Sequence, residues 1–185
     1  MAKLGGDVTS VLGDGRALCV RDARPRDARP LASLLDAVAA EPRPALLMLP
    51  GQFGPGVWRK RITEALTEPG CLQLSACVDD ELAGNLGLRP DGHPCAAHVA
   101  TIGMSVAAAF RGLGVGGALL ETAAAWAAAH GIVKLTLGVF PENVRAVAFY
   151  ERHGFVHEGR RRAQYVRAGQ YHDEVLMARF LTPVP

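Results

Sequence analysis

A glycine-rich stretch near the middle of the chain has the clearest potential for chemistry. It reads Arg111-Gly112-Leu113-Gly114-Val115-Gly116-Gly117. Glycine has no side chain, so main-chain amides in this stretch can approach a ligand closely. A helix that begins behind the turn presents free N–H groups and the positive end of its dipole. The stretch therefore predicts an anion site, most often one for a phosphate or diphosphate.

Two other interpretations of this turn follow from its spacing and surroundings. Gly112, Gly114 and Gly117 also match G-x-G-x-x-G, the fingerprint of dinucleotide-binding folds. Against that match, the strands in front form a meander, and the next strand ends in Gly138-Val139 with no acidic residue for a ribose. A P-loop is excluded because no GxxxxGK[ST] run occurs. A turn that only packs a helix against a sheet stays open as the plainer interpretation.

A second group of residues follows after the next predicted strand. Asn143 and Tyr150 stand two helical turns apart, so their side chains share one face of a helix. The small Ala146 lies between them and leaves room for a ligand, and Gly154 ends the helix. Taken singly, Asn143 is more simply a helix N-cap, and Tyr150 a packing residue.

The surrounding pattern predicts the elements that must position these two groups. Strands are expected over 17–21, 71–78, 82–88, 97–106, 132–139, 155–162 and 175–181. Helices are expected from the cap Asp27 through Val38, over 57–66, from the glycine turn to about 130, and over 143–153. A proline- and glycine-rich loop over 42–56 could form one wall of a substrate site. This order predicts a mixed α+β fold, mostly antiparallel, with one parallel crossover pair.

Length and composition indicate one globular unit. The chain has 185 residues, of which 49% are hydrophobic, enough for one substantial core. We expect residues 1–16, which include four glycines, to be a flexible tail, and 17–185 to be a single domain. The balance of 20 basic and 18 acidic residues does not favour a nucleic-acid partner.

The sequence offers no pattern for a membrane or a metal. No apolar run is long enough to span a bilayer, and residues 1–16 lack the apolar segment of a signal peptide. The four cysteines, Cys19, Cys71, Cys77 and Cys95, have neither CxxC nor zinc spacing. Scattered thiols fit a reducing compartment, so we expect a cytoplasmic protein.

Together the two groups resemble the GNAT superfamily of N-acetyltransferases. Its acetyl-CoA signature, Gln/Arg-x-x-Gly-x-Gly/Ala, stands here as the run from Arg111 to Gly116. Its second signature, an Asn, a small residue and a Tyr followed by Gly-Phe, stands as ENVRAVAFYERHGF over 142–155. The resemblance covers about 17–181, and the run over 159–180 is similar to the phosphinothricin and L-amino-acid N-acetyltransferase branch. It implies an acyl-CoA N-acyltransferase fold, with six to seven strands and helices on both faces.

The resemblance implies a role for each matching residue. The main chain of Met104, Ser105 and Val106 would run along the pantetheine arm of acetyl-CoA. Arg111 and the amides from Gly112 to Gly117 would surround the diphosphate, and Asn143 would bind the arm. The Val106 N–H would stabilise the oxyanion. Tyr150 would give a proton to the departing thiolate, which is reasonable if the site lowers the phenol pKa from ~10 or a water helps.

The sequence departs from the family at the expected general base. Some relatives carry a Glu where Gly138 stands, five residues before Asn143. Glu142, His98 and a water chain are the alternatives, and none is assigned, because a surface carboxylate and a strand-packing histidine are the simpler interpretations. The run Arg160–Arg162 is most simply a solvated strand face, with carboxylate recognition as the minority interpretation. Tyr171, His172 and Asp173 could line the acceptor site.

The implied activity is direct transfer of an acetyl group from acetyl-CoA to a primary amine, with no covalent enzyme intermediate and no metal. The expected acceptor is a small molecule such as an amino acid or an amino-acid-like antimetabolite. A protein N-terminus or lysine is the next choice. A non-catalytic acetyl-CoA-binding module and a nicotinamide-dependent oxidoreductase are the rival classes. A homodimer is compatible with the resemblance, since dimers are common among relatives.

Overall fold

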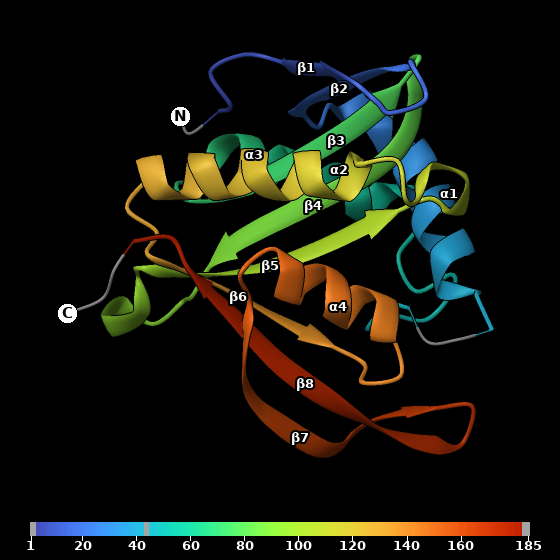
Figure 1. Ribbon diagram of the computed structural model, residues 1–185, viewed down its shortest axis with the longest axis vertical. Helices are drawn as coiled ribbons and strands as arrows, with labels where there is room; N and C mark the ends of the chain where they lie inside the picture. The colour runs from blue at the N-terminus through green and yellow to red at the C-terminus, as the bar shows by residue number, and fades with distance from the viewer. Residues whose placement is uncertain (1–2, 43–44, 183–185) are drawn as a thin grey trace.

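The computed structural model describes residues 3–42 and 45–182. Within these residues eight strands form one sheet, in the order β1-β2-β3-β4-β5-β6-β8-β7 (Figure 1). The strands are β1 (Val8–Val11), β2 (Ala17–Asp22), β3 (Leu72–Val78), β4 (Glu81–Pro90), β5 (Val99–Val106), β6 (Lys134–Val139), β7 (Val156–Arg167) and β8 (Gln170–Phe180). Neighbouring strands are antiparallel except β5 and β6. The mostly antiparallel sheet with one parallel pair is confirmed.

The sheet has one strand more than the six to seven expected. β1 lies inside the segment 1–16 that was expected to be a flexible tail, and it pairs antiparallel with β2. All four of its side chains are exposed. No alternation of buried and exposed positions therefore marks this edge strand in the sequence.

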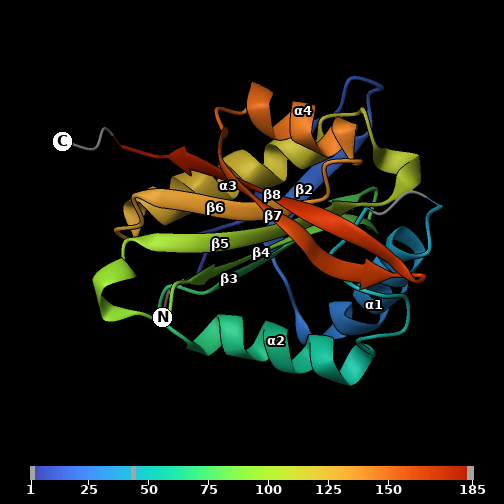
Figure 2. The ribbon, with the colours of Figure 1, turned by 90° about the horizontal axis from the view of Figure 1, so that it is seen from below.

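Helices cover both faces of the sheet, as expected. Figure 2 shows α1 (Ala28–Ala39) and α2 (Pro55–Thr67) on one face, and α3 (Val115–Ala129) and α4 (Val144–Arg152) on the other. The apolar face of α3 packs on the sheet through the buried residues Leu119, Leu120, Ala123, Trp126 and Ala127. Alternate residues of β6, beginning with Leu135 and Leu137, join the same core. Their neighbours Thr136 and Gly138 consequently face the α1 and α2 side.

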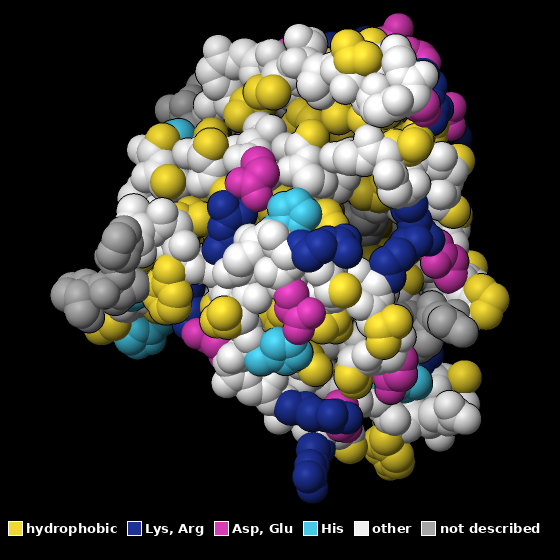
Figure 3. All heavy atoms as spheres, in the orientation of Figure 1, with side chains coloured by type: hydrophobic (Ala, Val, Ile, Leu, Met, Phe, Trp, Pro, Cys, Tyr) yellow, Lys and Arg dark blue, Asp and Glu magenta, His cyan; other side chains and the backbone are white. Residues whose placement is uncertain are grey.

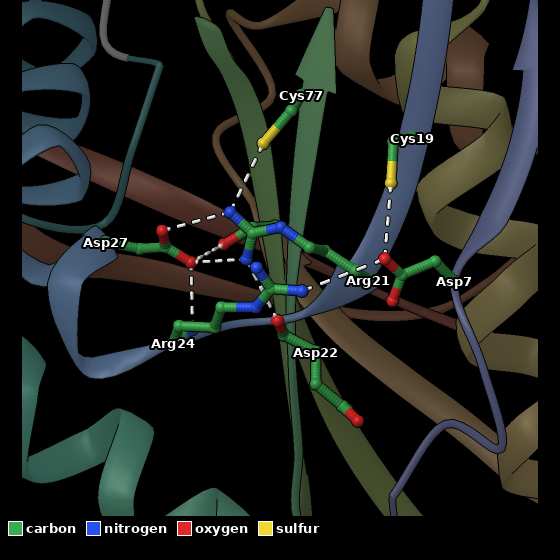
Figure 4. Close-up of polar contacts among 8 residues, drawn as sticks. Asp7, Cys19, Arg21, Asp22, Arg24, Asp27 and Cys77 are labelled. Carbon is green, nitrogen blue, oxygen red and sulfur yellow. Dashed lines mark hydrogen bonds and ion pairs between the residues drawn. The ribbon is translucent and has the colours of Figure 1, made fainter. Parts of the chain in front are cut away.

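The start of α1 differs from the sequence prediction in one detail. Asp27 occupies the N-cap position, but its carboxylate makes no cap hydrogen bond to α1. It accepts instead from the two Nη atoms of buried Arg21 (2.6 and 3.1 Å), from Ser75 Oγ (3.0 Å) and from the Arg24 N–H (2.8 Å) (Figure 4). This cluster joins α1 to β2 and β3, the strands behind the site.

The surface in Figure 3 mixes basic and acidic side chains and has no continuous basic patch on that face. In the two described ranges of the chain, no helix is both long and apolar enough to cross a bilayer. No group of three or more metal-ligating side chains gathers within those ranges.

Candidate active site

A gap in the sheet lies between the two parallel strands. β5 and β6 pair only at their beginnings, and the last pair is Thr101 with Thr136, whose Oγ1 atoms are 3.0 Å apart. Beyond this pair, β5 continues to Val106 and β6 to Val139 without pairing with each other. Figure 1 shows the two strands separating. The gap therefore exposes unpaired main-chain groups of β5.

The register of β4 and β5 decides which amides face this gap. Val106 pairs with Gly84, and the next amide, Ala107 N–H, donates to the Ala83 carbonyl oxygen (2.9 Å). Antiparallel pairs alternate between hydrogen-bonded and non-bonded positions. Val106 and Met104 are therefore at non-bonded positions, with their N–H groups turned away from β4 and toward the gap. The main chain of Ser105 is turned to β4 instead.

The glycine turn presents a series of free amides next to this gap. Gly112 (φ +78°) and Gly114 (φ +98°) have left-handed backbone conformations, which favour glycine. The first amide of α3 with a main-chain acceptor is Ala118 N–H, which donates to the Gly114 carbonyl oxygen (3.0 Å). Among the described residues, the amides over 112–117 have no acceptor. Such a series of N–H groups at a helix N-terminus fits a diphosphate.

Arg111 fixes the turn to its surroundings. Its Nε donates to the Val106 carbonyl oxygen (2.8 Å), and its guanidinium pairs with Glu41 beyond the end of α1. Leu113 packs against the core and Val115 is buried within it. The guanidinium of Arg111 is therefore engaged within the protein, and the open groups of the turn are its amides.

Helix α4 closes the other side of the same space. A Cβ added at Gly116 would lie 3.4 Å from the ring of Phe149 on α4 and 3.7 Å from the Met104 methyl group on β5. One added at Gly117 would lie 3.4 Å from His153 Nε2. The structure thus brings together the end of β5, the turn and α4, as the two sequence signatures require.

Asn143 and Tyr150 occupy the expected ends of α4. Asn143 caps the helix, with Oδ1 accepting from the Ala146 N–H (3.2 Å), and its Nδ2 donates to the Ala45 carbonyl oxygen (3.4 Å). Tyr150 is buried between the rings of Phe149 and Phe155. Burial raises the pKa of Tyr150 to about 12. The phenol is therefore in its proton-donating form at neutral pH.

A cavity of about 370 Å³ lies on the opposite face of β4 and β5, beneath α1 and α2. Its apolar wall includes Leu46 and Met48 of the predicted loop, together with Trp58 of α2. Asn85, which is buried, also lines it, and its Oδ1 has no hydrogen-bond partner among the described residues. Gln73 also lines the cavity, and its Nε2 likewise has no hydrogen-bond partner among the described residues. Such a cavity, apolar with a few unpaired polar atoms, is suited to a small polar ligand.

The cavity also contains a cation that the sequence analysis missed. Arg61 of α2 lines it and stacks on the rings of Phe53 (4.4 Å) and Trp58 (4.8 Å). No carboxylate among the described residues pairs with Arg61, and desolvation lowers the pKa of its guanidinium. Arg61 stands in a basic run with Arg59 and Lys60, and this gave no signal, because the stacking depends on how the loop over 45–53 folds.

The base candidates from the sequence are exposed or half exposed. His98 is exposed and precedes β5, at the end opposite Val106. Glu142 is half exposed and faces His172, with 3.6 Å between Oε1 and Nδ1. Gly138 lies instead against a carboxylate from another strand: a Cβ added there would be 1.9 Å from Glu174 Oε1. Glu174 is buried, and no sequence motif pointed to it.

The arginine run is largely paired within the β7–β8 hairpin. Arg160 Nε pairs with Asp173 (2.7 Å) and Arg161 Nη1 pairs with Glu174 (3.0 Å), while Arg162 is exposed. Tyr171, the second residue of β8, is exposed. These contacts agree with a mainly structural run.

The fold and site together define a class of protein. A sequence model described as the acetyltransferase (GNAT) family matches residues 41–155, more than half of the chain. The chain belongs to the GNAT family of N-acetyltransferases, enzymes that use acetyl-CoA, and the open amides of the turn and the gap fit that co-substrate.

Named relatives place the chain within this family. It is 32% identical over 127 residues to the L-amino acid N-acetyltransferase AaaT of Escherichia coli strain K12, covering 66% of this chain and 75% of AaaT. A GNAT-family acetyltransferase structure from Streptococcus pneumoniae is 27% identical, with a TM-score of 0.80 over 88% of this chain and 99% of that one. The structure of a phosphinothricin acetyltransferase from Sinorhizobium meliloti with acetyl-CoA, 17% identical, shares the fold with a TM-score of 0.78, covering 87% and 86%.

Proposed function

We propose that the chain transfers the acetyl group of acetyl-CoA to the α-amino group of a small, amino-acid-like acceptor bound in the cavity beneath α1 and α2. The observation that carries this proposal is the Arg61 guanidinium. It lies in the cavity, stacked on two aromatic rings, without a carboxylate partner among the described residues. A partly desolvated cation gains most from a ligand that supplies the missing negative charge. The relative named as an L-amino acid N-acetyltransferase supports the same acceptor class.

On this proposal, Met104 and Val106 bind the pantetheine arm with the amides that face the gap, and Ser105 borders the arm. The amides from Gly112 to Gly117 hold the diphosphate, with Arg111 fixing the turn. Asn143 keeps its capping bond through Oδ1. Its Nδ2, which makes a long hydrogen bond to the Ala45 carbonyl oxygen, donates to the coenzyme arm instead.

The proposed chemistry divides between a main-chain amide and a phenol. The amine attacks the thioester carbonyl carbon, and the Val106 N–H stabilises the negative charge that develops on the carbonyl oxygen. Tyr150 supplies a proton to the leaving thiolate. Because burial raises the Tyr150 pKa to about 12, above that of a thiol at ~8.5, we propose that a water assists this transfer.

The test is release of free coenzyme A thiol over a panel of amines. The panel pairs each amino acid with the amine that lacks its carboxylate, and adds aminoglycosides, polyamines and short peptides. We expect turnover with amino acids and weak turnover with the decarboxylated partners. Preference for peptides would contradict the acceptor class, and binding of acetyl-CoA without turnover on any amine would contradict the activity.

Arg61→Met tests whether the Arg61 guanidinium binds the carboxylate of the acceptor. It keeps an apolar side chain against Phe53 and Trp58 but removes the charge. We expect KM for amino acids to rise roughly tenfold or more, because hydrogen bonds to charged groups are the strong ones, with little change for decarboxylated amines. Arg59→Met, at an exposed position of the same helix, is the matched control. Equal effects on both kinds of acceptor would remove Arg61 from carboxylate recognition.

A further inference from the structure

The Glu174 side chain occupies the space beside Gly138, a residue without a side chain on the neighbouring strand β6. A Cβ added at Gly138 would lie 1.9 Å from Glu174 Oε1 and 2.7 Å from its carboxyl carbon, closer than packed atoms approach. Gly138 on β6 pairs with Leu176 on β8, and Glu174 reaches across from β8 two residues before Leu176. The carboxylate consequently occupies the position from which a side chain at residue 138 would project.

This position is on the same face of the sheet as the cavity. Thr101 and Thr136 meet through their hydroxyls, which fixes their common face. Side chains alternate along a strand, so Gly138 shares the face of Thr136, while Gly103 and Ser105 share that of Thr101. Thr101, Gly103 and Ser105 line the cavity. The Glu174 carboxylate therefore lies across the gap from the strand that lines the cavity.

The contacts of Glu174 hold its carboxylate in place but leave it able to accept more bonds. The residue is 4% exposed. Arg161 Nη1 donates to Oε2 (3.0 Å) and the Tyr165 hydroxyl donates to Oε1 (3.1 Å), both from β7. A carboxylate has about four lone-pair sites, so each oxygen has one to spare. The Arg161 side chain is more than half exposed, so its guanidinium is also solvated by water.

The hairpin that carries Glu174 is fixed to the loop that walls the cavity. Arg167 of β7 donates to the main-chain oxygens of Leu46 (3.4 Å) and Ala39. Leu46 itself lines the cavity. The acceptor space is thereby bordered by the loop over 45–53 on one side and the β7–β8 hairpin on another.

We propose that Glu174 binds the ammonium group of the acceptor and takes its proton. The inference rests on the proposed function and adds the group that prepares the amine for attack. One N–H proton passes to the carboxylate, and the freed lone pair forms the C–N bond as the C–S bond breaks. After the C–N bond has formed the nitrogen loses its second proton, which Tyr150 regains in place of the one that it gave to the thiolate. Glu174 returns its own proton to solvent, so each turnover of an ammonium substrate releases one proton.

The experiment follows kcat/KM against pH for the unaltered chain and for Glu174→Gln, which keeps the shape but cannot accept a proton. We expect a loss of roughly 10²-fold at neutral pH, the range of a general base. The loss should shrink as pH approaches the pKa of the free amine, because the substrate then arrives deprotonated. A loss that is constant with pH would indicate a structural role and overturn the proposal, as would no loss at all.

The groups that could distort this profile are those packed against Glu174. They are Arg161 and Tyr165 of β7, and on its own strand His172 and Asp173, which contact Glu142 and Arg160 respectively. The pH profile of kcat/KM is therefore also measured for Tyr165→Phe and for Arg161→Met. A profile that moves with either of these variants but not with Glu174→Gln would overturn the assignment.

A readout without acetyl transfer comes from acceptor binding in the presence of coenzyme A, measured by calorimetry. We expect Glu174→Gln to weaken acceptor binding about tenfold and to leave coenzyme A binding unchanged. Glu81→Gln, at the exposed first residue of β4, is the control for the substitution itself. Unchanged acceptor binding would count against the proposal.

Relocating the carboxylate gives a second test, which holds even if Glu174→Gln does not fold. Glu174→Ala empties the space that blocks a side chain at residue 138, and Gly138→Glu then places a carboxylate there from β6. We expect the double variant to recover at least tenfold activity over Glu174→Ala alone. No recovery in a folded double variant would overturn the inference. No turnover by the unaltered chain with any amine would instead overturn the proposed function.

Discussion

The Tyr150 hydroxyl and the amides of the glycine turn carry the proposed chemistry at the scale of single residues. Tyr150 is held between Phe149 and Phe155 and makes no hydrogen bond through its hydroxyl to any other described residue. Gly114 has φ +98°, and a Cβ there would meet nothing within 4 Å. Packing thus fixes the phenol, and backbone conformation alone requires the glycine.

Tyr150→Phe should lower kcat about 10²-fold and leave coenzyme A affinity nearly unchanged. Phenylalanine keeps the ring packing and removes only the proton donor, whose loss acts on the leaving thiolate. Steady-state kinetics and a coenzyme A titration measure the two effects separately. Equal losses in both would indicate that Tyr150 packs the site and donates no proton.

Gly114→Val should weaken coenzyme A binding by about tenfold or more. A β-branched residue in a left-handed conformation costs of order 1–3 kcal/mol, and the amides would shift to relieve it. Gly15→Val is the matched control, since Gly15 also has positive φ (+87°) and open space around it but lies between β1 and β2. If both variants bind coenzyme A as the unaltered chain does, the turn is not part of the site.

At the scale of elements, the buried Asp27 cluster ties α1 to the sheet. Burial alone would raise the pKa of Asp27, but the hydrogen bonds from Arg21, the Arg24 N–H and Ser75 outweigh it, and the pKa is lowered. The Arg21 pKa is raised, chiefly by its hydrogen bond to Asp27. The cluster therefore stabilises the fold whenever the carboxylate is ionised.

Asp27→Asn should reduce the free energy of unfolding at pH 7 by about 3–5 kcal/mol, because it leaves the buried Arg21 charge unpaired. A carboxyl with a lowered folded pKa stabilises above its unfolded pKa of ~3.9, and that contribution is lost as pH falls through the folded value. Urea unfolding at pH 7 and below pH 4 should show the difference between variant and parent shrinking in acid. Asp14→Asn, at an exposed ion pair, should change little. A difference independent of pH would contradict the ionic origin.

At the scale of the whole molecule, the proposed coenzyme site spans elements that are distant in sequence. It joins β5, the turn before α3, and α4, all packed on one core. Coenzyme A should therefore stabilise the entire fold, by about 2.7 kcal/mol at a concentration of 100 Kd. Thermal unfolding with increasing coenzyme A should show a rising midpoint, and Gly114→Val should require more ligand for the same rise. No shift at millimolar coenzyme A would contradict the site.

The sequence predicted what depends on local spacing. The glycine turn and the Asn143–Tyr150 face are set by helix geometry within short segments, so both were placed correctly. Glu174 and Arg61 depend on strand register and on a loop fold, which bring together residues distant in the chain. Asp27 looked like a simple cap because Arg21 and Ser75 are not adjacent to it in sequence. β1 is exposed on both faces and carries no periodic signal.

The most direct measurement of the central claim is a crystal structure of the chain with coenzyme A. We predict diphosphate oxygens within hydrogen-bond distance of amides between Gly112 and Gly117, the arm along Met104 and Val106, and the sulfur beside the Tyr150 hydroxyl. A diphosphate bound elsewhere, or a sulfur remote from Tyr150 with the turn amides unoccupied, would contradict it.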